Sequence, residues 1–315
     1  MKLHNDIKIF KDSIRMASQH LIINEVFVEK DYWITLVLSR LAKSKYAANT
    51  VFKGGTSLAK GFGLINRFSE DVDIAIIDED KKSGNEIKTI IRAVEKDMTK
   101  ELTELQMEGV SSKGSKFRKS VFEYVSIDAK NKNNKLIIEV NSFANPFPFQ
   151  ALIIKSLLFD FLTQTGNDKF AKQYDLQPFK INVLNKEQTM LEKMVSLIRF
   201  SFDGNPIESL SKKIRHFYDL YFLMNDEGCA AFIKSDNFKQ QFNEILNHDK
   251  KIFDEPTGWQ TKKVTESPLI TDFENIWKQL KGIYKMELSA LAFTKIPNEE
   301  KIAKQIKKLT KLIQC

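Results

Sequence analysis

The chain has few of the residues that mark disulfide scaffolds, zinc sites or flexible linkers. Its 315 residues include two cysteines, Cys229 and Cys315, together with 12 glycines and 7 prolines. Two cysteines so far apart build neither a disulfide framework nor a Cys/His zinc site, and such scarcity is typical of proteins of the reducing cytoplasm. We therefore expect a cytoplasmic protein.

Long apolar runs are also missing. The longest apolar stretch, ALIIKSLLFDFL, is interrupted by Lys155 and Asp160 and is too short to cross a bilayer. The N-terminal segment MKLHNDIKIFKDSIRMA carries charges throughout and has no apolar core of the signal-peptide type. These features predict a soluble protein with no membrane partner.

The charge balance is moderately basic. The net charge is +8, with 42% hydrophobic and 29% charged residues. This composition is sufficient for one large domain or two of ordinary size. A basic excess of this degree is compatible with an anionic partner such as a nucleic acid, but many lysine-rich proteins share it.

Hydrophobic patterning predicts an α/β part followed by helices. Apolar residues at helical spacing predict an amphipathic helix in EKDYWITLVLSRLAKS, and a second, longer helix is predicted over residues 84–105. Alternating or β-branched runs predict strands in NTVFK, SEDVDIAII and QPFKINVLN, and a hairpin formed by SVFEYVSIDAK and KLIIEVNSF around the turn NKNN.

The pattern becomes helical after about residue 185. We therefore predict an α/β domain at residues 1–185 and a helical domain at 186–315. The helices of the second part are expected at residues 186–200, 210–224, 237–249, 272–286 and 298–314.

A glycine pair stands between a predicted strand and a predicted helix. In VFKGGTSLAKGF, Gly54 and Gly55 are followed by Thr56 and Ser57, one of which is expected near the helix N-cap. Glycines let backbone N–H groups approach a ligand closely, and a helix N-terminus favours an anion. The hydroxyl groups can add donors, so this turn is suited to phosphate.

Two aspartates follow on the next predicted strand. Asp71 and Asp73 stand at i and i+2, so their side chains share one face of the strand. Like charges so close repel each other, and hard carboxylate oxygens are the ligands that suit Mg²⁺. A third carboxylate would complete a two-metal site; Glu139, polar within an apolar strand, is the first candidate and Asp128 the second.

Each feature has an ordinary explanation when taken alone. A Gly-Gly pair is commonly just a turn, and an Asp-x-Asp pair is commonly solvated at a strand end. The order strand, Gly-Gly-Thr-Ser, helix and Asp-x-Asp strand is much more specific. It favours a metal-dependent phosphoryl or nucleotidyl transferase, and the spacing of a P-loop is absent.

The same residues resemble a known family. FKGGTSLAK followed by RFSEDVDIAI is similar to the nucleotidyltransferase superfamily, in particular to the AbiEii/AbiGii toxin family with the MenT-type toxins of type IV toxin–antitoxin systems. The upstream VEKDYWITLVL is similar as well. The resemblance implies an α+β fold, with a polymerase β-like nucleotidyltransferase core, a mixed sheet and a C-terminal helical domain.

Two later segments extend the resemblance. LEKMVSLIRF resembles the third motif of the family, which implies that Lys193 contacts the nucleoside triphosphate with Arg199 nearby. RHFYDLYFL resembles the fourth motif, which implies that Asp219 lies in the active site. His216 departs from that motif, which commonly has aspartate there, and we expect it to be structural or exposed. The gap before Asp71 is longer than usual, which predicts extra loop length near residues 63–66.

The resemblance and the motifs together predict an Mg²⁺-dependent enzyme that moves a nucleoside monophosphate from a nucleoside triphosphate to an acceptor hydroxyl. The family implies the 3′ end of tRNA as acceptor, growth inhibition as the outcome and a cognate antitoxin as partner. The expected catalytic residues are Asp71, Asp73, Glu139, Lys193 and Asp219, the first three as metal ligands. The expected nucleotide-binding residues are Gly54, Gly55, Thr56, Ser57, Lys60 and Arg199.

Two other functions stay open. The acceptor could be a protein or small-molecule hydroxyl, or the chain could be a nucleotide-binding module without turnover. The C-terminal segment favours RNA, because Ile302, Ile306, Leu309 and Ile313 share one helical face and lysines lie largely off it. A solvated helix face explains that pattern equally well.

Overall fold

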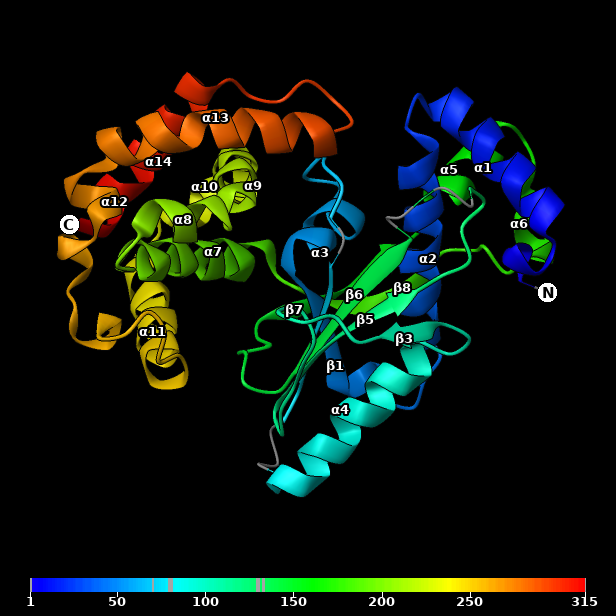
Figure 1. The fold of residues 1–315 in the computed structure, drawn as a ribbon, viewed down its shortest axis with the longest axis horizontal. Coiled ribbons are helices and arrows are strands. Elements are labelled where there is room, and N and C mark those ends of the chain that lie inside the picture. The colour runs from blue at the N-terminus through cyan, green and yellow to red at the C-terminus, as the bar shows by residue number, and fades with distance from the viewer. Residues whose placement is uncertain (1, 70, 79–81, 129–130, 132–133, 315) are drawn as a thin grey trace. The chain divides into compact units, whose positions relative to one another are not determined.

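The computed structural model describes residues 2–69, 71–78, 82–128, 131 and 134–314. It divides into two units (Figure 1). The first comprises Met1–Phe62 and Phe68–Leu184, and the second comprises Gly63–Arg67 and Asn185–Cys315. The predicted loop of extra length therefore groups with the second unit, although it lies in sequence between two segments of the first.

Eight strands of the described residues form one mixed sheet in the first unit. The strand order is β3-β5-β6-β2-β1-β8-β7, with β4 beside β5. β2 pairs parallel with β6, and β1 pairs parallel with β8, whereas the other pairs are antiparallel. The strands are β1 (Thr50–Lys53), β2 (Asp71–Ile76), β3 (Thr103–Leu105), β4 (Ser112–Lys113), β5 (Phe117–Glu123), β6 (Lys135–Asn141), β7 (Phe149–Ile154) and β8 (Phe179–Leu184).

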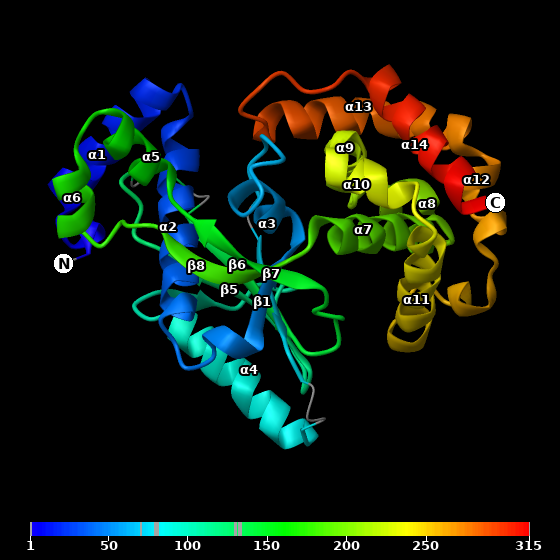
Figure 2. The same cartoon turned by 180° about the vertical axis from the view of Figure 1, so that it is seen from behind.

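One face of the central strands is buried beneath two helices. Val72 and Ile74 of β2, with Ile138 of β6, have no exposed surface. Helices α2 (Glu25–Ala42) and α4 (Gly84–Met98) pack against each other and against β5, β6 and β8, as seen from behind in Figure 2. Because side chains alternate along a strand, the intervening residues of β2 and β6 point to the opposite face.

Helix α2 is not the amphipathic helix that its spacing predicts. Glu29, Lys30 and Asp31 are buried together with the apolar residues of the helix. The charged side chains have polar partners: the carboxylate of Glu29 accepts a hydrogen bond from the backbone N–H of Ile127 at 2.7 Å. Charged residues in a helix therefore do not always mark its exposed face, because paired charges are tolerated inside a protein.

The helix predicted over residues 84–105 is shorter in the structure. It ends at Met98, where Thr99 donates a hydrogen bond to the carbonyl of Glu95, and Glu101 has a positive φ of 68°. The chain then enters β3. The predicted hairpin of β5 and β6 is confirmed by their antiparallel pairing, although residues 132–133 of its turn lie outside the described residues.

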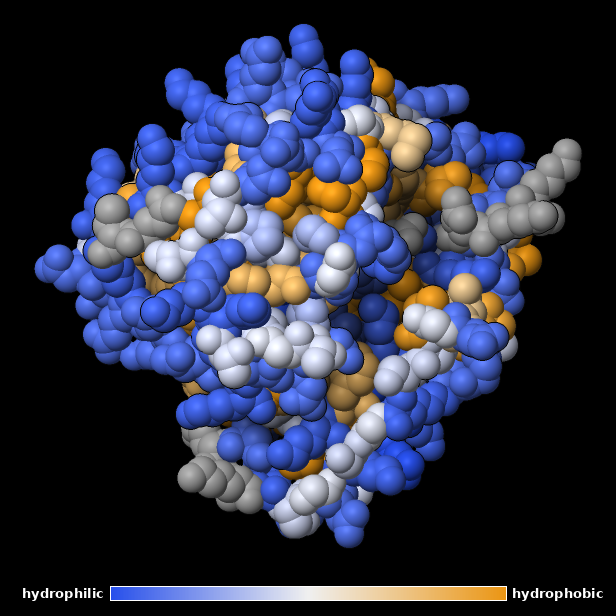
Figure 3. All heavy atoms as spheres, turned by 60° about the vertical axis from the view of Figure 1, so that its left-hand side comes forward, coloured by the Kyte–Doolittle hydropathy of each residue, from blue (hydrophilic) through white to orange (hydrophobic). Residues whose placement is uncertain are grey.

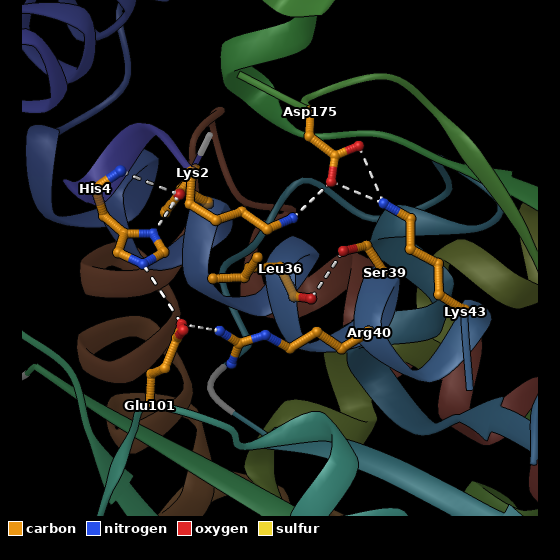
Figure 4. A network of polar contacts seen from close by, with 9 residues as sticks. Lys2, His4, Leu36, Ser39, Arg40, Lys43, Glu101 and Asp175 are labelled. Carbon is orange, nitrogen blue, oxygen red and sulfur yellow. Dashed lines mark hydrogen bonds and ion pairs between the residues drawn. The ribbon is translucent and has the colours of Figure 1, made fainter. Parts of the chain in front are cut away.

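The N-terminus of the first unit is held by an ion-pair network (Figure 4). Asp175 accepts from Lys2 at 2.6 Å and from Lys43 at 2.8 Å, and Arg40 pairs with Glu101 at 2.6 Å. The network joins α2 to segments far away in sequence. The remaining helices of this unit are η1 (Leu3–Asn5), α1 (Ile7–Leu21), η2 (Ala47–Asn49), α3 (Gly54–Lys60), α5 (Leu157–Gln164) and α6 (Asp168–Gln173).

The second unit is helical apart from its loop segment. Its core includes Phe217, Tyr218 and Trp259, which are almost completely buried. Its helices are α7 (Lys186–Ser201), α8 (Pro206–Ser211), α9 (Ile214–Asn225), α10 (Glu227–Ile233), α11 (Asn237–Ile252), η3 (Trp259–Thr261), η4 (Val264–Glu266), α12 (Pro268–Thr271), α13 (Phe273–Leu291) and α14 (Glu299–Gln314). A mixed sheet followed by helices confirms the predicted α+β class.

No helix within the described ranges is long and apolar enough to span a membrane. Hydrophilic side chains prevail on the face shown in Figure 3, and apolar ones appear among them in small patches. This distribution agrees with the burial of most large apolar residues in the two cores.

Candidate active site

The sheet brings three predicted carboxylates to one face. Asp71 and Asp73 are the first and third residues of β2, and both are half-buried. Glu139 of β6 is the Cα partner of Asp73 across the parallel pair. Partners in register point to the same side of a sheet, here the side opposite α2 and α4. The arrangement therefore concentrates negative charge on a small area of the first unit.

The electrostatics of Asp73 reflect this concentration. Burial raises the pKa of Asp73 well above its usual value, and the charges of Glu139 and Asp71 raise it further. Lys53 and Lys119 oppose the rise. A cation placed among the carboxylates would remove the repulsion that causes this shift.

Both lysines follow from the strand pairing. Lys53 is the Cα partner of Asp73 on β1, and Lys119 is the Cα partner of Glu139 on β5. The Nζ of Lys119 lies 3.8 Å from Oε2 of Glu139. Sequence reasoning missed these two residues, because a lysine in a strand carries no local signal of what stands beside it in the sheet.

Asp128, the second candidate for the third carboxylate, lies elsewhere. It follows the end of β5 and is exposed. It has no strand register with Asp71 or Asp73, whereas Glu139 does. The strand pairing thus favours Glu139 as the companion of the aspartates.

The glycine turn lies directly against Asp73. Gly54 has a φ of +80°, a conformation that favours glycine. A Cβ at Gly54 would stand 2.0 Å from Oδ2 of Asp73, far inside any real contact. Gly54 is therefore glycine for two reasons, its backbone conformation and the carboxylate beside it. The turn and the Asp-x-Asp strand, 17 residues apart, form one local structure.

Thr56 and Ser57, one of which is expected near the helix N-cap, lie in the first turn of helix α3. Helix α3 begins at Gly54 after the cap residue Lys53, and no side chain caps it. Thr56 donates its hydroxyl hydrogen bond to the backbone carbonyl of Asp71, and Ser57 donates to the carbonyl of Gly54 at 2.8 Å. Both side chains are buried, so in this structure their hydroxyls hold the turn and β2 together.

Lys60, a predicted nucleotide ligand, is paired inside the first unit. Its Nζ lies 2.5 Å from Oδ1 of Asp31 on α2. The other oxygen of Asp31 accepts a hydrogen bond from the backbone N–H of Leu157 at 2.8 Å. Lys60 thus holds α3 to α2 in this structure.

Lys193 and Asp219 meet in the second unit. The Nζ of Lys193, on α7, lies 2.9 Å from Oδ2 of Asp219, on α9. Arg67 donates to the same carboxylate through two nitrogens, from Nε to Oδ1 and from Nη2 to Oδ2, both at 2.7 Å. All three side chains are almost completely buried, with exposed fractions of 7%, 0% and 3% for Lys193, Asp219 and Arg67.

The two cations decide the charge of Asp219. Burial by itself opposes ionisation, but Arg67 and Lys193 outweigh it and hold the pKa of Asp219 well below its usual range. The pKa of the nearby His216 is also lowered: burial, followed by the charge of Lys193, brings it well below the usual value and so favours the neutral imidazole. Neutral His216 is consistent with the structural role expected for it.

Arg199 belongs to a different cluster of the second unit. It stands six positions after Lys193 in α7, an offset that places the two side chains on different faces of the helix. Its guanidinium carbon stands 3.9 Å from the ring centre of Phe253 and 5.8 Å from that of Trp259, and Nη1 lies 3.8 Å from Asp249. In the structure Arg199 thus contacts Phe253, Trp259 and Asp249, whereas Lys193 contacts Asp219.

A pocket of the first unit lies apart from these residues. It is lined by residues of α2, β8 and the segment near Asp175, and it contains none of the predicted site residues. Within the part of the chain that the structure describes, no three His, Cys, Asp or Glu side chains are grouped closely enough to hold a metal ion as they stand. Asp71, Asp73 and Glu139 nevertheless supply the oxygen donors and the negative charge that Mg²⁺ requires.

Comparison with known proteins gives a family. The model of the family described as nucleotidyl transferase AbiEii toxin, type IV TA system, matches residues 36–301. This range includes every predicted site residue and covers most of both units. No curated protein matches the chain.

Seven chains of solved structures match. One is MenT4, a nucleotidyltransferase toxin from Mycobacterium tuberculosis H37Rv, which is 13% identical in sequence. The match has a TM-score of 0.45 and covers 95% of this chain and 98% of that one.

Proposed function

Since the chain belongs to the AbiEii family of nucleotidyltransferase toxins of type IV toxin–antitoxin systems, we propose that it transfers a nucleoside monophosphate from a nucleoside triphosphate to the 3′ hydroxyl of tRNA. A tRNA blocked at that end cannot be aminoacylated, so growth stops. The proposal includes dependence on Mg²⁺ and a cognate antitoxin that restrains the enzyme. The observation that carries the chemistry is the register of Asp73 with Glu139, next to Asp71.

The three carboxylates fit Mg²⁺ by donor type and by charge. The raised pKa of Asp73, caused by burial and by Glu139 and Asp71, indicates repulsion that a divalent cation would relieve. Asp71, Asp73 and Glu139 would therefore hold the ion. When bound, it would supply Lewis-acid stabilisation of the phosphate oxygens and of the acceptor oxygen.

The protein's own residues bind and orient the triphosphate. In this proposal the turn Gly54–Ser57 holds the phosphates, because glycines let backbone N–H groups approach a ligand closely. Lys193 contributes its side-chain nitrogen to the triphosphate in this proposal; in the second unit that nitrogen lies 2.9 Å from Oδ2 of Asp219. The acceptor oxygen then bonds to the α-phosphorus, the bond to the bridging oxygen breaks, pyrophosphate leaves and the hydroxyl proton passes to solvent.

The charge of the helical unit supports RNA as the acceptor. In α14, Ile302, Ile306 and Leu309 are buried, and an exposed row of lysines lies on another face of the helix. The exposed lysines of this helix are Lys301, Lys304, Lys308 and Lys311. Such a row is suited to contacts with successive phosphates, and contacts of this kind release counterions, so tRNA affinity should fall steeply with salt.

The test is transfer of label from a nucleoside triphosphate carrying ³²P at the α-position. Purified enzyme is incubated with each of the four nucleotides, Mg²⁺ and total tRNA, with and without periodate oxidation of the 3′ end. We expect label on intact tRNA and none on oxidised tRNA. Equal labelling of the two tRNAs, or label on protein only, would overturn the proposed acceptor. Nucleotide binding without any transfer would indicate a binding module.

A further inference from the structure

The carboxylate of Asp219 is enclosed by two cations of its own unit. Arg67 occupies both of its oxygens and Lys193 shares Oδ2, and the Asp219 side chain has no exposed surface. In this arrangement Asp219 contacts Arg67 and Lys193 rather than solvent. Its influence on a substrate must then act through the side chains that it holds.

We infer that Arg67 and Asp219 are positioning residues, which fix the ammonium of Lys193 for the triphosphate. This inference rests on the proposed function, because it assumes that Lys193 contacts the nucleotide. It adds Arg67 to the site, and it gives Asp219 a different role from the catalytic one that the motif implied.

The geometry of the Arg67–Asp219 pair supports positioning. Two parallel hydrogen bonds of 2.7 Å join the planar guanidinium to the planar carboxylate. A bidentate pair fixes the orientation of the carboxylate as well as its location, which a single contact cannot do. The two hydrogen bonds from Arg67 fix the position of Oδ2, and the Lys193 ammonium is held 2.9 Å from that oxygen.

The main chain of Arg67 is itself anchored in the second unit. Arg67 forms an isolated antiparallel bridge with Ala292, just after α13. The neighbouring Asn66 accepts a hydrogen bond from the backbone N–H of Phe293 at 2.8 Å. The loop Gly63–Arg67 is thus held at its backbone, and the guanidinium starts from a defined point.

The held ammonium retains donors for a ligand. An ammonium group has three N–H donors. Among the residues that the structure places, Asp219 is the one polar partner of Lys193. Two N–H groups of a nearly buried lysine therefore remain for phosphate oxygens, and their directions are set by the contact with Asp219.

A purely structural ion pair is the competing explanation, because buried pairs also join helices. A double-mutant cycle on nucleotide KM separates the two. The variants are Arg67→Lys, Lys193→Ala and their combination; Arg67→Lys keeps the charge but loses the fork. Asp219 retains at least one cation in every variant. Lys186→Ala is the matched control, since Lys186 also lies on α7 and pairs with an aspartate, Asp226, at 2.6 Å.

We expect Lys193→Ala to raise nucleotide KM about tenfold and Arg67→Lys to raise it about fivefold, with unchanged acceptor KM. In the Lys193→Ala background, Arg67→Lys should raise nucleotide KM by a further factor of less than about two, because the lysine that Arg67 positions is absent. Lys186→Ala should leave both KM values unchanged. Thermal unfolding of each variant shows that it is folded.

The outcomes separate the inference from the function on which it rests. If Lys193→Ala leaves nucleotide KM unchanged, the proposed role of Lys193 is wrong. The positioning role is overturned in two cases, both with Lys193→Ala raising nucleotide KM. In the first, Arg67→Lys leaves nucleotide KM unchanged; in the second, the double variant raises nucleotide KM by the full product of the two single effects. Should Arg67→Lys fail to fold, Asp219→Asn replaces it in the same cycle with the same expected non-additivity.

Discussion

The contact between Gly54 and Asp73 offers a sharp test of the carboxylate site. Gly54 and Gly63 both have positive φ, +80° and +61°, so alanine at either position strains the backbone by about 1–2 kcal/mol. A Cβ at Gly63 meets no atom within 4 Å, whereas one at Gly54 stands 2.0 Å from Oδ2 of Asp73. Comparing Gly54→Ala with Gly63→Ala therefore isolates the effect of displacing Asp73.

The size of the displacement sets the expected loss. Real contacts of a Cβ are at least 3.0 Å, so the Asp73 carboxylate or the turn must move by about 1 Å. Misplacement of a reacting group by about 1 Å costs roughly 100-fold in rate. We expect Gly63→Ala to lose about 1–2 kcal/mol of stability and Gly54→Ala at least as much, but only Gly54→Ala to lose about 100-fold in turnover.

The assay is initial rate of label transfer at saturating nucleotide, together with urea unfolding of both variants. Urea unfolding measures the loss of stability, which includes the backbone strain common to both variants. The initial rate measures the effect of displacing the Asp73 carboxylate. If Gly54→Ala retains the activity of Gly63→Ala to within a factor of a few, Asp73 does not need its place against the turn, and the reasoning is refuted.

Three further predictions follow from the charges. Burial, Glu139 and Asp71 raise the pKa of Asp73, so this carboxyl group destabilises the metal-free fold at pH values above its ordinary pKa. Asp73→Asn should therefore raise the melting temperature of metal-free protein, yet abolish turnover and the increase in melting temperature caused by Mg²⁺ and nucleotide; a mutant that keeps this increase would contradict the prediction. The pKa of Asp219 is instead held low by Arg67 and Lys193, so the ionised carboxylate stabilises the fold at neutral pH and this stabilisation is lost as acid protonates it. Asp219→Asn should lower the free energy of unfolding by about 3 kcal/mol at pH 7. In urea unfolding, the gap in free energy of unfolding between wild type and mutant should narrow below about pH 4. A difference that grows in acid would disprove that assignment. Exchanging Lys304 and Lys308 for glutamate should weaken tRNA binding and flatten its salt dependence without changing nucleotide KM; an unchanged slope in a filter-binding titration would remove α14 from the RNA surface.

Local patterns in the sequence determined the elements and the order of the motifs. Strand alternation, the glycine pair and the Asp-x-Asp spacing depend on neighbours in the chain, and the structure has β1, α3 and β2 in that order. The α14 pattern likewise predicted the buried face with Ile302, Ile306 and Leu309. Such features are readable because periodicity of 2 or 3.6 residues is a property of the segment itself.

Only the tertiary structure decided which residues share a site. Strand register paired Glu139 rather than Asp128 with Asp73, and packing buried Lys60 against Asp31. The segment Gly63–Arg67 joined the helical unit and brought Arg67 to Asp219, 152 residues away in sequence. These outcomes depend on register across strands and on contacts between distant segments, and neither can be predicted from the local periodicity of the sequence.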